Sequence, residues 1–274
     1  YAAALSKLEA LQARMPSDQD VLMFVGFVSR RVGRWQESID ALERARLAAP
    51  NDATLAYHLG VTLSTFGLKE RAISALDDSL AIRHDPSALF MRLQVEWQDG
   101  ELANADAILA KYDDGSAPVL ALRGDQAMFR RDFAGASALY ARALANASDL
   151  QSDSDFNGYI EARVAWKLKQ AAAESRLGHA DAAKLLYTGA AEEARKSLAG
   201  NPGNPNVRAA WHAVLAIALA GLHDAQPARE QAQLAMKEVP ADFDKLEGPA
   251  WADYALLVDA MNGDATRAVP GLRR

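Results

Sequence analysis

The chain has 274 residues, half of them hydrophobic and few of them aromatic, with no cysteine and a formal net charge of −6. The lack of cysteine excludes disulfides, thiolate zinc sites and cysteine nucleophiles, and the acidic balance argues against nucleic-acid binding. No apolar run approaches the roughly 20 residues that a membrane-spanning helix needs.

The first residues, YAAALSKLEALQARMP, form an amphipathic pattern typical of a mature helix rather than of a signal peptide. From this point the sequence repeats itself, because several residue types recur at one spacing. The matches at 34 residues are Pro16 and Pro50, Gly26 and Gly60, Gly33 and Gly67, Ala4, Ser38 and Ala72, and Leu8, Leu42 and Leu76. A fixed period of this length is the signature of a repeat protein.

Each repeat predicts two helices joined by a turn. The first helix carries its apolar stripe at positions i, i+3, i+4 and i+7, namely Leu22, Val25, Gly26 and Ser29, which recur as Ala56, Leu59, Gly60 and Leu63. A glycine then breaks the chain, and a second amphipathic stretch ends at a proline, which cannot continue a helix. Such a helix pair cannot bury its apolar face alone, so it is expected to stack on its neighbours.

The pattern continues along the chain with changes. It persists with one residue deleted at 90–112 and returns at 120–144, and from about residue 158 the helices are expected to be longer. The sequence therefore predicts repeats over 1–146, a polar linker over 147–157, and longer, degenerate repeats over 158–274. Because the first and last repeats are incomplete, we expect the chain to be part of a longer protein.

The period and these residues resemble the tetratricopeptide-repeat family. The resemblance implies an all-α fold without a sheet, a right-handed superhelical stack of antiparallel helix pairs (an α-solenoid). A looser resemblance covers Val239-Pro-Ala-Asp, Gly248-Pro, Ala255-Leu-Leu, Gly263-Asp and Ala268-Val. It is similar to the C-terminal repeat regions of bacterial signalling proteins and transcription regulators.

The stretch 152–161, SDSDFNGYIE, has the alternating oxygen ligands and the glycine of half a calcium loop, with Asp153, Asp155 and Asn157 as the ligands. A complete loop needs a bidentate glutamate at its twelfth residue, where this sequence has Val164. We therefore expect no calcium site, and no metal or cofactor elsewhere. The polar residues are expected to cap the helix that follows.

No enzyme is expected, because no nucleotide-binding, zinc-protease or serine-hydrolase motif occurs. His84-Asp85 and His223-Asp224 fall at predicted helix ends, where capping explains them better than a metal dyad. Arg123-Gly124-Asp125 spells a cell-adhesion tripeptide, but its glycine occupies the position where the helices of a repeat pack closely.

The resemblance implies that the first helices line a concave groove that binds an extended or helical peptide with apolar anchors. The residues expected to contact the partner are Met23, Phe27, Arg30, Arg31, Tyr57, Val61, Ser64, Met91 and Val95. The alternative is that neighbouring segments of the protein itself fill this groove. Self-association through the terminal repeats is also open.

Two function classes remain. The first is a non-catalytic scaffold for protein–protein interaction, in a larger bacterial signalling or regulatory protein. The second is a structural module of a bacterial envelope or secretion complex. The compartment is open between the cytoplasm, which is slightly favoured, and the periplasm.

Overall fold

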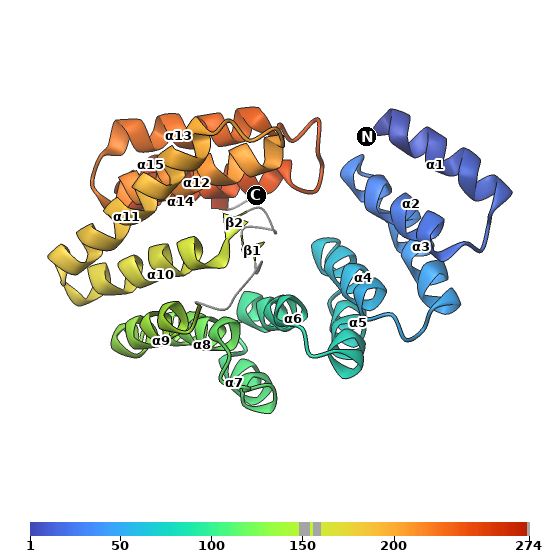
Figure 1. Ribbon diagram of the computed structural model, residues 1–274, viewed down its shortest axis with the longest axis horizontal. Coiled ribbons are helices and arrows are strands. Elements are labelled where there is room, and N and C mark those ends of the chain that lie inside the picture. Colours follow the sequence, from blue (N-terminus) through green and yellow to red (C-terminus); the bar gives the residue numbers. More distant parts are fainter. Residues whose placement is uncertain (148–153, 156–159, 273–274) are drawn as a thin grey trace. The chain divides into compact units, whose positions relative to one another are not determined.

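The computed structural model describes residues 1–147, 154–155 and 160–272, and these residues are helical almost throughout (Figure 1). The chain divides into two compact units. The first comprises Tyr1–Asp113 together with Phe243–Leu246, and the second comprises Asp114–Asp242 and Glu247–Arg274. The predicted all-α fold of stacked helix pairs is confirmed.

The first unit contains seven of the described helices: α1 (Ala2–Arg14), α2 (Gln19–Arg31), α3 (Trp35–Ala48), α4 (Ala53–Thr65), α5 (Lys69–Ile82), α6 (Pro86–Asp99) and α7 (Leu102–Lys111). An aspartate starts the first helix of each pair. The side chains of Asp18, Asp52 and Asp85 accept hydrogen bonds from backbone N–H groups in the first turn of α2, α4 and α6. These caps satisfy amides that have no partner inside the helix.

Glycine fixes both the turn and the packing of the first two complete pairs. Gly33 and Gly67 adopt φ of 82° and 78°, a left-handed conformation that glycine reaches without strain. At Gly26 a Cβ would lie 2.6 Å from the Cγ of Leu42, so the leucine packs directly on the backbone of α2. The 34-residue period therefore encodes a turn and a close helix contact together.

The third pair, α6 and α7, keeps the turn but loses the close contact. Gly100 adopts φ 74°, whereas the position seven residues before the turn glycine, which is glycine in α2 and α4, is Leu93 in α6. A buried leucine side chain replaces the bare backbone of glycine at this position, and α6 packs much less extensively on α7 than the earlier pairs pack together. This pair is the last one of the first unit.

The second unit holds the helices α8 (Ala117–Phe129), α9 (Phe133–Ala145), α10 (Ala162–Leu177), α11 (Ala180–Ala199), α12 (Pro205–Gly221), α13 (Ala225–Glu238), α14 (Gly248–Met261) and α15 (Ala265–Leu272). Helices α10, α11 and α12 are longer than those of the first unit. The all-α prediction omitted one feature, a two-residue antiparallel ladder of β1 (Ser154–Asp155) and β2 (Ile160–Glu161). It lies where the sequence predicted the end of a polar linker.

An alanine-rich core holds the second unit together, with the eight consecutive buried residues 213–220 of α12 and the fully buried Trp251 among its members. The division between the units falls after Asp113, ahead of the change in repeat length that the sequence places at 147–157. Among the described residues, no helix combines the length and the apolar character required to cross a bilayer.

Candidate protein-binding surface

The outward sides of α2 and α4 carry an aromatic cluster, which we define as Phe24, Phe27, Tyr57 and His58. The Phe27 ring meets the His58 ring edge-on, with centroids 4.3 Å apart. Phe24 approaches Phe27 at 6.2 Å, and Tyr57 approaches His58 at 5.0 Å. Phe24 is 50% exposed, whereas the other three side chains are partly buried. The cluster thus offers one exposed ring on a platform of fixed rings.

The buried Arg30 side chain packs against these rings. Arg30 is only 6% exposed, and its guanidinium lies 5.1 Å from the Phe27 ring centroid. The same guanidinium donates a hydrogen bond to Thr62 Oγ1 at 3.0 Å, and the Thr62 hydroxyl donates to the His58 carbonyl at 2.8 Å. Cation–π attraction and hydrogen bonds therefore lock Phe27 and α4 in one arrangement.

The imidazole in this cluster is neutral at pH 7. Burial lowers the pKa of His58 to about 4, and the nearby positive charge of Arg30 adds to the effect. Burial disfavours the charged imidazolium, and a cation beside it does the same. The cluster therefore presents apolar and weakly polar surface, with its one guanidinium held beneath the rings.

The predicted partner-contacting residues differ in how much of each side chain is exposed to solvent. Met23 is partly buried and packs against the core cluster that contains Leu22. Val61, Ser64 and Met91 are also partly exposed. Val95 is 4% exposed and Arg30 6%, so these two side chains offer almost no surface to a partner.

The first of two residues that the sequence analysis missed is Phe24, which follows Met23 and lies one helical turn before Phe27. The second is His58, which follows Tyr57. Neither was predicted, because the expected binding face included Met23 and Tyr57 but not the residue that follows each of them. The available signal was the spacing of Phe24 and Phe27, since residues three apart share one helix face.

The α6 part of the expected surface is polar instead of apolar. Arg92 donates to Glu96 at 2.5 Å and to Asp77 at 2.9 Å, and Asn104 donates to Glu96 at 3.2 Å. Burial on its own would raise the pKa of Glu96, but the hydrogen bonds from Arg92 and Asn104 together hold it below its usual value. Glu96 is therefore an anchored carboxylate that holds α6 against α7.

Arg31, expected at the basic edge of the surface, is already engaged. Its guanidinium forms an ion pair with Asp244, whose side chain is fully buried. The partner comes from the segment Phe243–Leu246, which counts with the first unit. Arg31 is therefore occupied by a segment of the chain itself.

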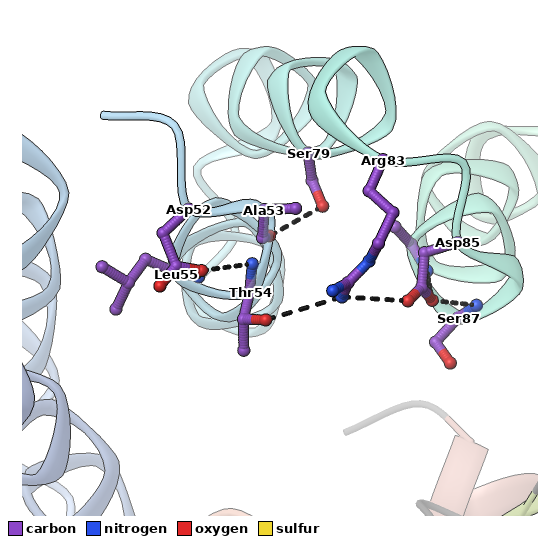
Figure 2. A network of polar contacts seen from close by, with 9 residues as sticks. Asp52, Ala53, Thr54, Leu55, Ser79, Arg83, Asp85 and Ser87 are labelled. Atoms are coloured by element: carbon purple, nitrogen blue, oxygen red, sulfur yellow. Dashed lines mark hydrogen bonds and ion pairs between the residues drawn. The ribbon is translucent and has the colours of Figure 1, made fainter. Parts of the chain in front are cut away.

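An open pocket of about 570 Å³ lies at the turns of the same unit, lined by Ala49, Pro50, Asn51, Asp52, Ala53, Ile82 and Arg83. Figure 2 shows the Arg83 side chain between Thr54 and Asp85. Its Nη2 donates hydrogen bonds to Thr54 Oγ1 at 3.5 Å and to Asp85 Oδ2 at 3.2 Å. Asp52 caps the amides of Thr54 and Leu55, so the start of α4 is satisfied internally. These contacts explain how successive repeats are joined, and they leave the pocket few groups for a ligand.

The remaining motif residues have structural roles. At Gly124 a Cβ would lie 2.6 Å from the Tyr140 ring, and Asp125 is 7% exposed and accepts hydrogen bonds from Tyr140 and Lys169. Gly124 and Asp125 of the Arg-Gly-Asp tripeptide are thus buried in a helix contact, whereas Arg123 is exposed. His84 stacks near Tyr112 at 5.3 Å.

The calcium-like stretch is only partly described. Asp153 and Asn157 lie outside the described residues, and Asp155 belongs to β1. Val164, at the position of the missing glutamate, is 2% exposed in the core of the second unit, and Glu161 pairs with Arg163. Within the part of the chain that the structure describes, no group of three or more acidic or histidine side chains could hold a metal ion.

No protein-family model and no curated protein sequence matches this chain. Solved structures do: a tetratricopeptide-repeat protein from Parabacteroides merdae superposes with a TM-score of 0.56 at 13% identity, over 94% of this chain and 91% of that one. The chain has the tetratricopeptide-repeat fold.

Two further structures with this fold come from assemblies or assembly factors. A chain of the APC/C hetero-tetramer Cut9–Hcn1 superposes with a TM-score of 0.55 at 16% identity, over 91% of the present chain and 45% of that chain. The chain thus spans less than half the length of this tetratricopeptide-repeat neighbour. PilW, a widely conserved type IV pilus biogenesis factor, gives a TM-score of 0.52 at 14% identity, over 69% of this chain and 83% of its own.

Proposed function

We propose that this chain is a non-catalytic scaffold that binds a protein or peptide partner through the aromatic cluster of α2 and α4. The observation that carries the proposal is the half-exposed Phe24 ring, held at the edge of a platform made by Phe27, Tyr57 and His58. Exposed aromatic rings next to rigid, water-excluding neighbours are the residues that contribute most to protein–protein affinity.

The expected partner is a peptide segment with apolar side chains. The cluster has a neutral imidazole, and its arginine lies beneath the rings, so it selects weakly for charge. The tetratricopeptide-repeat fold supports the proposal because it builds an extended surface from successive first helices.

A structural role in an envelope or secretion complex is the second candidate. The similarity to PilW, a pilus biogenesis factor by its title, supports this alternative. The proposal of a region within a bacterial signalling or regulatory protein rests on the pattern of residues 239–268 alone. Sequence adjoining the chain distinguishes the two: an effector domain supports the signalling role, and an export signal supports the envelope role.

The test compares Phe24→Ala with Phe66→Ala, a matched variant whose ring is 47% exposed at a turn of the same unit. A partner recovered with the wild-type chain is titrated against both variants. We expect Phe24→Ala to weaken binding about tenfold or more, which corresponds to about 1.4 kcal/mol, and Phe66→Ala to bind as the wild type does. Equal affinities for all three chains would remove the aromatic cluster as the binding site.

A further inference from the structure

The C-terminal end of α2 holds a short segment from far along the chain. The Arg31 side chain donates to Asp244 Oδ2 at 2.5 Å, and the backbone N–H of Lys245 donates to the Arg31 carbonyl at 2.9 Å. The Phe243 ring lies 5.1 Å from the Tyr1 ring. An ion pair, a backbone hydrogen bond and an aromatic contact therefore hold the segment at the end of α2.

The carboxylate at the centre of this contact is removed from water. Asp244 is 0% exposed, its second oxygen accepts the Leu246 N–H at 3.0 Å, and the Arg31 side chain is 21% exposed. Burying a carboxylate is costly unless it is paired and hydrogen-bonded. Both oxygens of Asp244 meet that condition, so the site is specific for an acidic side chain.

The C-terminal end of α2 has groups that can bind such a segment. The last carbonyls of a helix lack partners inside the helix, and the Lys245 amide supplies one for Arg31. A Cβ at Gly33 would lie 3.4 Å from Lys245 Cγ, an ordinary contact distance, so the turn at Gly33 runs directly beside the segment. The Arg31 guanidinium also lies 5.6 Å from the Tyr1 ring, which holds it toward the carboxylate.

We propose that Tyr1, Arg31 and Gly33 form a binding site for an acidic peptide turn in which an aromatic residue precedes aspartate, and that Phe243–Leu246 is its resident occupant. A partner that uses this site presents the same chemistry and displaces the segment. The site is separate from the aromatic cluster, and its tests need no external protein, so its failure leaves the function proposed above untouched.

The first test measures hydrogen exchange in the full chain. In Arg31→Ala, the amides of residues 243–246 are expected to exchange at least tenfold faster than in the wild type, while the amides of α4 keep their protection. Arg34→Ala is the control, because Arg34 is an exposed arginine close by that pairs with Glu9 and Glu37. Asp244→Asn, which keeps the side-chain shape, takes the place of Arg31→Ala if that variant unfolds. Unchanged exchange at 243–246 overturns the proposal.

The second test asks whether the site binds a peptide added in trans. The probe is a fluorescein-labelled peptide with the sequence of residues 241–247, and the receptor is the full chain with Phe243→Ala and Asp244→Ala. We expect saturable binding to this variant, at least tenfold weaker binding to the wild type, whose site is filled, and loss of binding when Arg31→Ala is added. Three outcomes would each refute the proposed peptide site. They are equal binding by wild type and variant, binding that survives Arg31→Ala, and no binding at about 1 mM peptide.

Discussion

Ala72 of α5 is buried among residues of α3 and α4, and replacing it with leucine tests the repeat packing directly. Its side chain is 0% exposed and belongs to a core cluster with Leu42 and Leu59. In the same helix pair a Cβ at Gly60 would lie 2.6 Å from the Cγ of Leu76. With the leucine side chain already against the α4 backbone, the pair has no slack to separate without losing contacts elsewhere.

Leucine adds three carbon atoms to this contact. Full burial of those atoms in available space would stabilise by about 2 kcal/mol, but in a close-packed contact the strain outweighs the gain. We therefore expect Ala72→Leu to cost about 1–3 kcal/mol.

The assay is urea unfolding followed by circular dichroism. A loss of about 2 kcal/mol lowers the urea midpoint by roughly 0.7–1 M at a slope of about 2–3 kcal/mol per M. The control is Ala81→Leu, the same substitution at an exposed position of the same helix, which should change stability by less than about 0.5 kcal/mol. Equal midpoints for the two variants would show that Ala72 does not occupy a helix contact.

Three further outcomes are expected. Replacing the cap residue Asp52 with alanine should cost about 1 kcal/mol in urea unfolding, and Asn51→Ala, one residue earlier, should cost less. The folded-state pKa of His58 is lowered to about 4, so the unfolded chain binds a proton first and stability should fall between about pH 6.5 and pH 4; His58→Gln should flatten that fall. Calcium at about 1 mM should stabilise by less than about 0.5 kcal/mol in thermal melts, and a larger shift that Asp153→Ala abolishes would establish a calcium site.

The features that the sequence predicted well are those encoded by neighbouring residues. A turn glycine such as Gly67 and a close-contact glycine such as Gly60 each act within one helix pair. Their recurrence at a fixed period therefore carries the fold. Gly124 was correctly placed in a helix contact for the same reason, since its register identifies it as a packing position.

The features that the sequence did not predict depend on contacts between distant residues. Nothing near Arg31 indicates that Asp244, more than 200 positions away, pairs with it. The contact of Phe27 with His58 likewise depends on the angle between α2 and α4, which the repeat period does not specify. Periodicity identifies the helix face that a residue occupies, whereas the partner on that face follows from the packing of whole helices.

The third helix pair shows how these two levels separate within one repeat. Its local signals are intact, because Asp85 caps α6 and Gly100 makes the turn. At the close-contact position, however, Leu93 replaces glycine, and the ion pair of Arg92 and Glu96 occupies the face that would otherwise be apolar. A buried ion pair contributes less net stability than well-packed apolar side chains of similar volume. The pair therefore folds by local rules but is weakly packed, and this gives a physical reason why the compact first unit ends directly after α7.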